Sequence, residues 1–129
     1  MATAIKPRLA PSDSLKREIQ AVLTDELADQ RNRTGHGRYD GFAYVAAEAY
    51  FHIAGGRDAG LQPVQLKHRG HSHWWLRDDR GRIVDLTLAS RETSGFPYER
   101  GKPRPFRYTP AGISRRAQVI VERVKASRR

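Results

Sequence analysis

The sequence predicts a single α+β domain in which one central helix packs on a small antiparallel β-sheet. Two patterns lead to this prediction. In residues 42–54 the apolar side chains recur at three- and four-residue spacing, which places them on one face of a helix. Between residues 62 and 88 apolar and polar residues alternate, which is the period of a strand with one buried face. With 129 residues, the chain is long enough for one domain with a modest core.

We expect residues 1–11 to form an extended arm, because they contain two prolines and no apolar period. The folded domain is predicted over residues 12–126, and residues 127–129 form a short basic tail. The first helix of the domain is predicted over residues 12–30. Its apolar stripe comprises Leu15, Ile19, Val22, Leu23 and Leu27. Three residues could supply its N-cap: Ser12, Asp13 or Ser14.

A second helix is predicted over residues 42–54, and we expect it to lie at the centre of the domain because it is short, rich in alanine and strongly apolar. Its predicted buried face comprises Phe42, Val45, Ala46, Ala49, Tyr50 and Ile53. Gly55 and Gly56 follow it, and a glycine in the left-handed conformation commonly ends a helix. The preceding residues 31–40 have two glycines and no apolar period, so they are predicted to form a loop.

Three strands are predicted to follow the central helix. The first includes residues 64–68 and the second residues 73–76, and a turn at residues 78–81 leads into the third, residues 82–88. The next segment, residues 89–111, is rich in glycine and proline. It is predicted to be a long ordered loop or a linker.

The pairing of the second and third strands decides whether two polar residues meet. A hairpin centred on Asp79 would set His73 opposite Asp85, with both side chains on one face of the sheet. A slip of one residue would put them on opposite faces. The turn residues leave this register open.

The last helix is predicted over residues 112–126, and the basic charge of the chain gathers around it. The formal net charge is +10, and residues 101–129 hold nine Lys and Arg but one acidic residue, Glu122. Such a segment attracts phosphate or another acidic surface. The residues expected to contact nucleic acid are Arg115, Arg116, Arg123 and Lys125. The alternative is a solvated basic surface without a partner.

Composition excludes several classes of protein. The chain has no cysteine, which removes disulfides, thiolate metal sites and thiol catalysis from the molecule as given. No apolar run approaches the roughly 20 residues needed to cross a bilayer. Pro7 and Pro11 interrupt any signal-peptide pattern at the N-terminus. We therefore expect a cytoplasmic protein that does not contact a membrane, and no cofactor is predicted.

Three residues stand in the order of a thiol active site. Ala43 lies at the start of the predicted central helix, His73 on a predicted strand and Asp85 on the next strand. A thiol at the first turn of a helix is activated by exposed N–H groups and the macrodipole. A histidine from a neighbouring strand moves the proton, and a carboxylate orients its ring. This is the order of papain-like and transglutaminase-like sites, with alanine in the place of the cysteine.

The residues beside these positions predict a substrate cleft. Gly41 would let a substrate approach position 43 closely. The predicted cleft comprises Gly41, Tyr44, Trp74 and Trp75. The two tryptophans are expected to build the core and the cleft wall, and Tyr44 to pack rather than to catalyse. Simpler alternatives are that His73 is a half-buried histidine stacked on Trp75, and that Asp85 is a strand-end carboxylate bonded to backbone N–H groups.

The histidines suggest a second kind of site. His71 and His73 share a face of one predicted strand, and His68 could lie on the adjoining strand. Three histidines can hold zinc with water in the fourth position. Nothing in the sequence fixes where His68 points, so no metal site is predicted.

The run Gly41–His52, which reads GFAYVAAEAYFH, resembles a small family of phage and bacterial proteins in which the run begins Gly-x-Cys-Tyr-Val-Ala-Ser-Glu-Ala. The runs Ser72–Asp78 and Gly81–Thr87 resemble the His-Trp-Phe-Leu and Asp-Pro-Thr segments of that family, and Pro97–Gly101 resembles a third block. The resemblance covers about residues 40–120. It implies a papain-like or transglutaminase-like fold with a Cys-His-Asp arrangement and, for a phage-encoded chain, a location in the host cytoplasm.

The chain departs from this family pattern at two positions: Ala43 replaces the cysteine, and Leu86 replaces the proline. The resemblance implies a parent activity of thiol-dependent acyl transfer or amide hydrolysis on a peptide or protein. His73 would then be the general base and Asp85 the residue that orients it. Because alanine occupies the nucleophile position, we expect no acyl transfer or amide hydrolysis at this site. Ala43 could result from an engineered change or from natural decay into a non-catalytic protein that binds a peptide or nucleic acid.

Overall fold

The structure is a computed structural model that describes residues 8–11, 13–35, 39–88, 93, 95–107 and 112–129. Parts of the predicted segments lie outside these residues. They are residues 1–7 of the arm, the candidate cap Ser12 of the first helix, residues 36–38 of the first loop, and residues 89–92, 94 and 108–111 of the second loop. The helices are α1 (Ser14–Ala21), α2 (Ala43–Ala54) and α4 (Arg115–Ser127). The strands are β1 (Gln62–His68), β2 (His71–Arg77), β3 (Ile83–Val84) and β4 (Lys102–Pro103). Short 3₁₀ turns are η1 (Asp25–Leu27), η2 (Gln30–Asn32), η3 (Gly56–Ala59) and η4 (Tyr98–Arg100).

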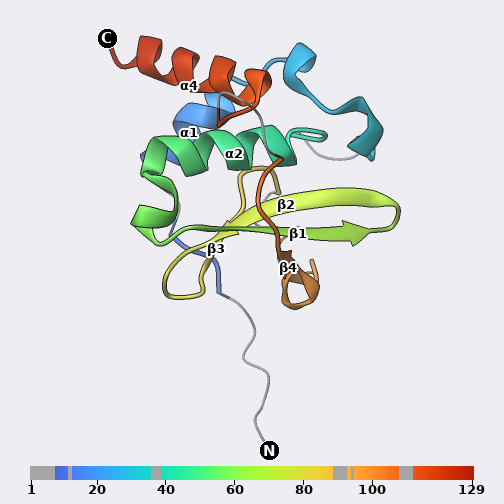
Figure 1. The fold of residues 1–129 in the computed structure, drawn as a ribbon. Coiled ribbons are helices and arrows are strands. Elements are labelled where there is room, and N and C mark those ends of the chain that lie inside the picture. Colours follow the sequence, from blue (N-terminus) through green and yellow to red (C-terminus); the bar gives the residue numbers. More distant parts are fainter. Residues whose placement is uncertain (1–7, 12, 36–38, 89–92, 94, 108–111) are drawn as a thin grey trace, which may run out of the picture.

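The described elements form an α+β fold, as the sequence predicts. Helix α2 lies between the sheet and α4, and α1 packs beside it (Figure 1). The strands form one antiparallel sheet in the order β3-β2-β1-β4. No helix within the described residues is long and apolar enough to cross a membrane.

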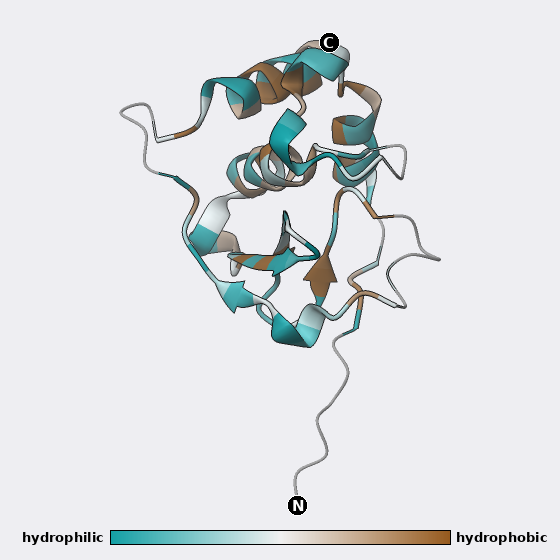
Figure 2. Cartoon of the chain, turned by 90° about the vertical axis from the view of Figure 1, so that its right-hand side faces the viewer, coloured by the Kyte–Doolittle hydropathy of each residue, from teal (hydrophilic) through white to brown (hydrophobic). Residues whose placement is uncertain are grey.

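Hydrophobic side chains pack on both faces of the sheet. The larger cluster fills the space between the sheet and the helices, and includes Ala46 of α2 and Leu76 of β2. The second cluster includes Val64 and Trp75, which alternate with the first set along the strands. Figure 2 shows hydrophobic and hydrophilic stretches following one another along α4, as expected of a helix with one buried face.

Helix α1 is shorter than the helix predicted over residues 12–30, which was wrong beyond Ala21. The chain continues as the separate turns η1 and η2. Arg123 of α4 donates hydrogen bonds to the Val22 carbonyl at 3.1 Å and to the Thr24 hydroxyl at 2.6 Å. This contact from a distant helix binds a carbonyl that a longer helix would use internally. The apolar stripe still reaches the core, because η1 buries Leu27.

The helix ends follow local capping rules. Asp13 caps α1 by accepting the Lys16 N–H at 2.9 Å, and Gly55 ends α2 in the left-handed conformation with φ 106°. Helix α4 begins three residues later than predicted, because Ser114 is its N-cap. It continues to Ser127, the first residue of the predicted tail, and the following Arg128 pairs with Glu18 of α1.

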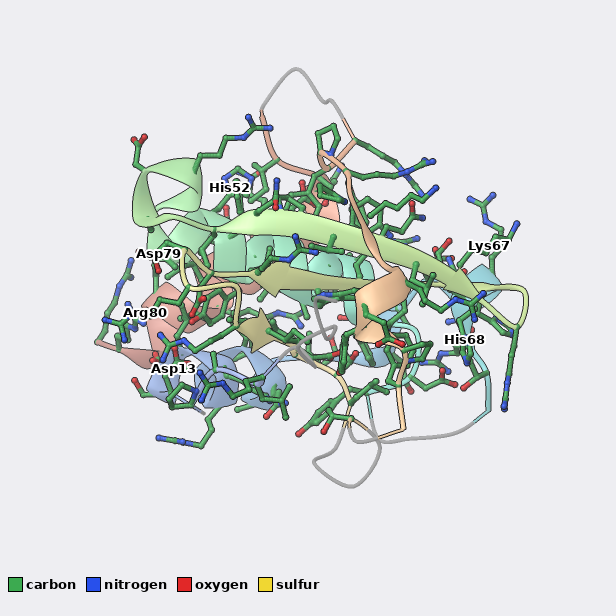
Figure 3. The ribbon with its side chains drawn as sticks, turned by 90° about the horizontal axis from the view of Figure 1, so that it is seen from below. Asp13, His52, Lys67, His68, Asp79 and Arg80 are labelled. Carbon is green, nitrogen blue, oxygen red and sulfur yellow. The ribbon has the colours of Figure 1, made fainter. Side chains whose placement is uncertain are left out.

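A two-residue turn joins β1 to β2. His68 pairs with His71, and the intervening Arg69 and Gly70 both have positive φ, at 52° and 82°. Turns with positive φ at both central positions match the twist of the flanking strands. Figure 3 shows His68 at this end of the sheet and Asp79 at the opposite end of the molecule.

Strand β3 is much shorter than the strand predicted over residues 82–88. The strand ends at Val84 because the side chain of the next residue, Asp85, binds the backbone of the residues that follow it. Its Oδ1 accepts the N–H of Thr87 at 2.9 Å and that of Leu88 at 3.0 Å. These N–H groups are thereby bound locally instead of in a ladder.

Two segments add to the sheet edges without having been predicted as strands. Strand β4 lies within the segment predicted as a loop, and pairs with β1 at Val64 and Gln65. On the other edge, residues 8–10 of the predicted arm bind β3: the Ile83 N–H donates to the Arg8 carbonyl, and the Ala10 N–H to the Ile83 carbonyl. The described part of the arm is therefore attached to the domain.

Candidate active site

The structure brings His73 and Asp85 into contact. Nε2 of His73 lies 2.6 Å from Oδ2 of Asp85, and the side chains are 14% and 1% exposed. The register of the two strands, which the sequence left open, differs by two residues from that of a hairpin centred on Asp79. The observed pairs Leu76↔Val84 and Arg77↔Ile83 place Asp85 diagonally across from His73 instead of opposite it. An offset of two residues keeps both side chains on one face, which is why the contact survives.

Asp85 is held as a buried carboxylate. Burial by itself would raise the pKa of its carboxyl group. The charge and hydrogen bond of His73, together with the backbone N–H groups of Thr87 and Leu88, instead lower the pKa of Asp85 to about 2. Since an ionised carboxylate only accepts hydrogen bonds, Nε2 of His73 is the protonated nitrogen of this contact. The other ring nitrogen, Nδ1, is the one left to meet a reacting group.

Aromatic rings fix the orientation of the His73 ring. Phe96 meets it edge-on with ring centres 4.8 Å apart, and Trp75 lies beside it with centres 5.7 Å apart. The ring is thus confined by packing as well as by Asp85. A histidine oriented in this way can transfer a proton to or from a group that reaches Nδ1.

A cavity of about 150 Å³ connects His73 with the start of α2. Ala43 and His73 both line it, together with Gly41, Tyr44, Trp74 and Phe96. Of the residues predicted to form the substrate cleft, Gly41, Tyr44 and Trp74 line this cavity. Trp75 does not: it is buried on the face of the sheet away from α2, among the second core cluster. Trp75 shares its face of β2 with His73 but lies two residues farther from His71, the end of the strand that the cavity reaches.

The cavity lies at an open end of β2. Strand β3 pairs with β2 at Leu76 and Arg77, and among the described residues no strand borders the other end of β2 on that side. Asn32 lies there instead, and its Oδ1 accepts the Ser72 N–H at 2.8 Å. Side chains from both faces of β2 can reach this end. This explains how Ala43, which belongs to the helix layer, and His73 line the same cavity.

Ala43 is the first residue of α2. At this point the backbone N–H groups of the first turn have no partner within the helix, and the helix dipole favours negative charge. The methyl side chain of Ala43 can neither attack a substrate nor titrate. A negatively charged group at this position would be stabilised, and the alanine side chain supplies none.

Gly41 has a role in packing that differs from the one predicted. It has a φ of 86°, a conformation that favours glycine. A Cβ at this position would come within 2.8 Å of Cγ of Arg33 and 3.1 Å of the Asp29 carbonyl. The glycine thus lets the segment before α2 pack against η2, which forms one wall of the cavity.

Tyr44 and Trp74 form an aromatic wall. Their rings meet edge-on with centres 5.0 Å apart, and Phe106 stacks on Trp74. The Tyr44 hydroxyl accepts the Arg107 N–H at 2.7 Å, and the Arg107 guanidinium lies over its ring. Burial raises the pKa of the Tyr44 hydroxyl, which keeps it neutral. Tyr44 therefore serves as a wall of the cavity that also anchors residues 106–107.

Sequence reasoning missed three residues that shape the site. Asn32 lies in a segment without an apolar period, and Phe96 and Tyr98 lie in a segment predicted as a loop or linker. Tyr98 donates a hydrogen bond to Asp85 from 13 residues away. The sole sequence signal was its place in the block Pro97–Gly101, which carries no information about a partner.

The structure places three of the histidines at the cavity. His68 pairs with His71 across the hairpin, and both line the cavity with His73. Within the described ranges no group of three or more His, Cys, Asp or Glu side chains could hold a metal ion. Nδ1 of His71 is buried and has no hydrogen-bond partner among the described residues.

The basic residues of α4 are partly engaged within the protein. Arg123 binds Val22, Thr24 and Glu26, and Arg116 donates to the Ala28 carbonyl at 3.3 Å. Arg115 and Lys125 are exposed. Of the four residues predicted to contact nucleic acid, two thus hold α4 against the segment that follows α1.

Comparison with models of protein families, with curated proteins and with solved structures finds no match to this chain. The function of the site is therefore inferred from its own geometry.

Proposed function

We propose that this chain has the framework of a papain-like or transglutaminase-like thiol hydrolase or acyltransferase whose nucleophile position is occupied by Ala43. The observation that carries the proposal is the His73–Asp85 hydrogen bond of 2.6 Å beside a cavity that Ala43 also lines. A buried carboxylate on one ring nitrogen, with the other nitrogen left for a reacting group, is the arrangement that activates a thiol or hydroxyl nucleophile.

The roles follow from the positions of the side chains. A cysteine at position 43 would stand at the N-terminus of α2, where the N–H groups of the first turn stabilise a thiolate. His73 would take the proton of the thiol and later give it to the leaving group. Asp85 would fix the ring with Nε2–H inward and stabilise the imidazolium. The cavity would receive the acyl group of a peptide or protein substrate.

The chain as it stands lacks covalent chemistry at this site. Alanine offers no lone pair to attack a carbonyl carbon, so we expect no acyl transfer and no amide hydrolysis. Binding of a peptide segment in the cavity does not need the thiol and is compatible with the same geometry.

Restoring the thiol tests the proposal directly. The variant Ala43→Cys is treated with iodoacetamide at pH 6 and pH 8, and the rate of alkylation is measured by mass spectrometry. We expect labelling at pH 6 at least about 10-fold faster than that of an ordinary thiol, because a thiolate is already present. The reference thiol is Ala59→Cys, at an exposed position remote from the cavity lining.

The pairing with His73 is tested in the same assay. In the double variant Ala43→Cys/His73→Ala the rate at pH 6 should fall to that of the Ala59→Cys reference, since no base remains to form the thiolate. Equal rates with and without His73 would remove the enzyme-like interpretation of the site.

A further inference from the structure

The Tyr98 side chain reaches the same carboxylate oxygen as His73. Its hydroxyl donates to Oδ2 of Asp85 at 2.8 Å, and Nε2 of His73 meets that oxygen at 2.6 Å. The carboxylate only accepts, so the hydroxyl is the donor and keeps its proton. The other oxygen, Oδ1, is held by the nearby backbone of Thr87 and Leu88. Oδ2 is thus the point where two distant segments meet.

Packing holds Tyr98 in this position. The residue is 6% exposed, and its ring meets Trp75 edge-on with centres 5.1 Å apart and Phe96 with centres 4.8 Å apart. At Gly101 a Cβ would collide with the Trp75 ring and would come within 2.8 Å of Cγ1 of Val64. The absence of a side chain at position 101 therefore allows the segment that carries Tyr98 to close against the sheet.

We infer that Tyr98 is a positioning residue for the His73–Asp85 pair, which orients the Asp85 carboxylate and limits how strongly that carboxylate holds a proton on His73. The inference deepens the function proposed above and rests on it. A second donor on Oδ2 reduces the negative charge that this oxygen presents to His73. A general base must also release its proton to a leaving group, and this release is easier when the carboxylate holds the proton on His73 less strongly.

The inference is tested on the chain with Ala43 in place, by following the His73 ring resonances in a pH titration by NMR. In Tyr98→Phe, Asp85 remains ionised and, among the described residues, only His73 still binds its Oδ2, while the N–H groups of Thr87 and Leu88 still bind Oδ1. We expect the pH midpoint of the His73 resonances to rise by about 0.5 unit. A folded Tyr98→Phe protein with an unchanged midpoint would overturn the inference, because a residue that only fills space does not alter proton binding.

The matched control is Tyr50→Phe. The Tyr50 hydroxyl also donates to a carboxylate, that of Asp13 at 2.6 Å, but outside the cavity. Removing this hydroxyl should leave the His73 midpoint unchanged. Equal shifts in the two variants would show a general effect of losing a hydroxyl and would also overturn the inference.

A measurement on the unaltered chain covers the case in which Tyr98→Phe does not fold. A hydroxyl proton donated to a buried carboxylate exchanges slowly with water, so Tyr98 should show a protected hydroxyl proton close to the His73 ring in nuclear Overhauser spectra. Absence of that proton signal at neutral pH counts against the inference.

The two proposals fail in different ways. If Ala43→Cys is not activated while the His73 midpoint shifts in Tyr98→Phe, the proposed thiol chemistry fails and the role of Tyr98 in setting the His73–Asp85 pair remains. If Ala43→Cys is activated and the midpoint does not shift, the role of Tyr98 alone is removed.

Discussion

Glu48, in the middle of α2, binds Ser114, the residue directly before α4. Its carboxylate accepts the backbone N–H of Ser114 at 3.1 Å and the Ser114 hydroxyl at 2.5 Å, across 66 residues of sequence. Glu48 is fully buried, and Ser114 in turn caps α4 by accepting the Ala117 N–H. The carboxylate lies where the helix dipole of α4 favours negative charge. One buried side chain of the central helix thus fixes the position of α4.

The first prediction is that Glu48→Ala destabilises the domain strongly. The substitution leaves the N–H and hydroxyl of Ser114 without their acceptor in a partly buried place, and it opens a cavity at the fully buried Glu48. We expect a loss of about 2–3 kcal/mol in the free energy of unfolding, measured with urea. The exposed Glu122→Ala in α4 is the control and should change stability far less. A loss equal to that of the control would contradict the role of Glu48.

The second prediction concerns the loss of stability of the folded protein at acid pH. The folded protein has a pKa of about 2 at Asp85, against the ordinary 3.8. Between these values the unfolded chain binds more protons than the folded one, so stability is present above pH 4 and is lost as the pH falls towards 2. From pH 6 to pH 3 we expect Asp85 to account for about 1 kcal/mol of lost unfolding free energy.

The measurement for this prediction compares urea unfolding of the chain and of Asp85→Asn at pH 6 and pH 3. The variant cannot titrate at this position, so its loss between the two pH values should be smaller by that amount. Equal losses in both proteins would mean that Asp85 does not hold its charge as the structure indicates.

The third prediction concerns the approach of residue 101 to the sheet. In Gly101→Ala the new methyl group would overlap the Trp75 ring, so either the ring or the segment carrying Tyr98 must shift. We expect a loss of about 1–3 kcal/mol, seen as a lower Tm. The control is Gly95→Ala, because a Cβ there meets nothing within 4 Å and the backbone φ is not in the left-handed region. A similar Tm for the two variants would argue against close packing at Gly101.

Features of the fold that depend on residues close together in the sequence were predictable. The limits of α2, the Asp13 cap and the glycine that ends the helix depend on residues within one or two turns, and the structure has them close to where the sequence places them. The helix predicted over residues 12–30 was wrong past Ala21 because its continuation competes with a contact to Arg123, 99 residues beyond Thr24. No local period records such a contact.

The candidate site shows the same division. The period of two along β2 places His73 on one face, and an even offset to Asp85 keeps the two together although the register is not that of a hairpin centred on Asp79. Trp75 shares the face of His73 but, unlike His73, does not line the cavity. The sequence of β2 does not show which of its faces packs against α2, because hydrophobic side chains cover both faces of this sheet.

By itself, the amino-acid sequence determined the helices α1, α2 and α4, the existence of strands β1 to β3, the glycine that ends α2 and the separation of His73 and Asp85 by an even number of positions. These properties follow from backbone geometry over a few neighbouring residues. Tertiary structure alone decided that Tyr98 donates to Asp85, that Glu48 binds Ser114 and that Ala43 and His73 line one cavity. Each of these contacts joins segments that are distant in the sequence, and burial of apolar surface, which has no preferred direction, does not specify which distant side chains meet.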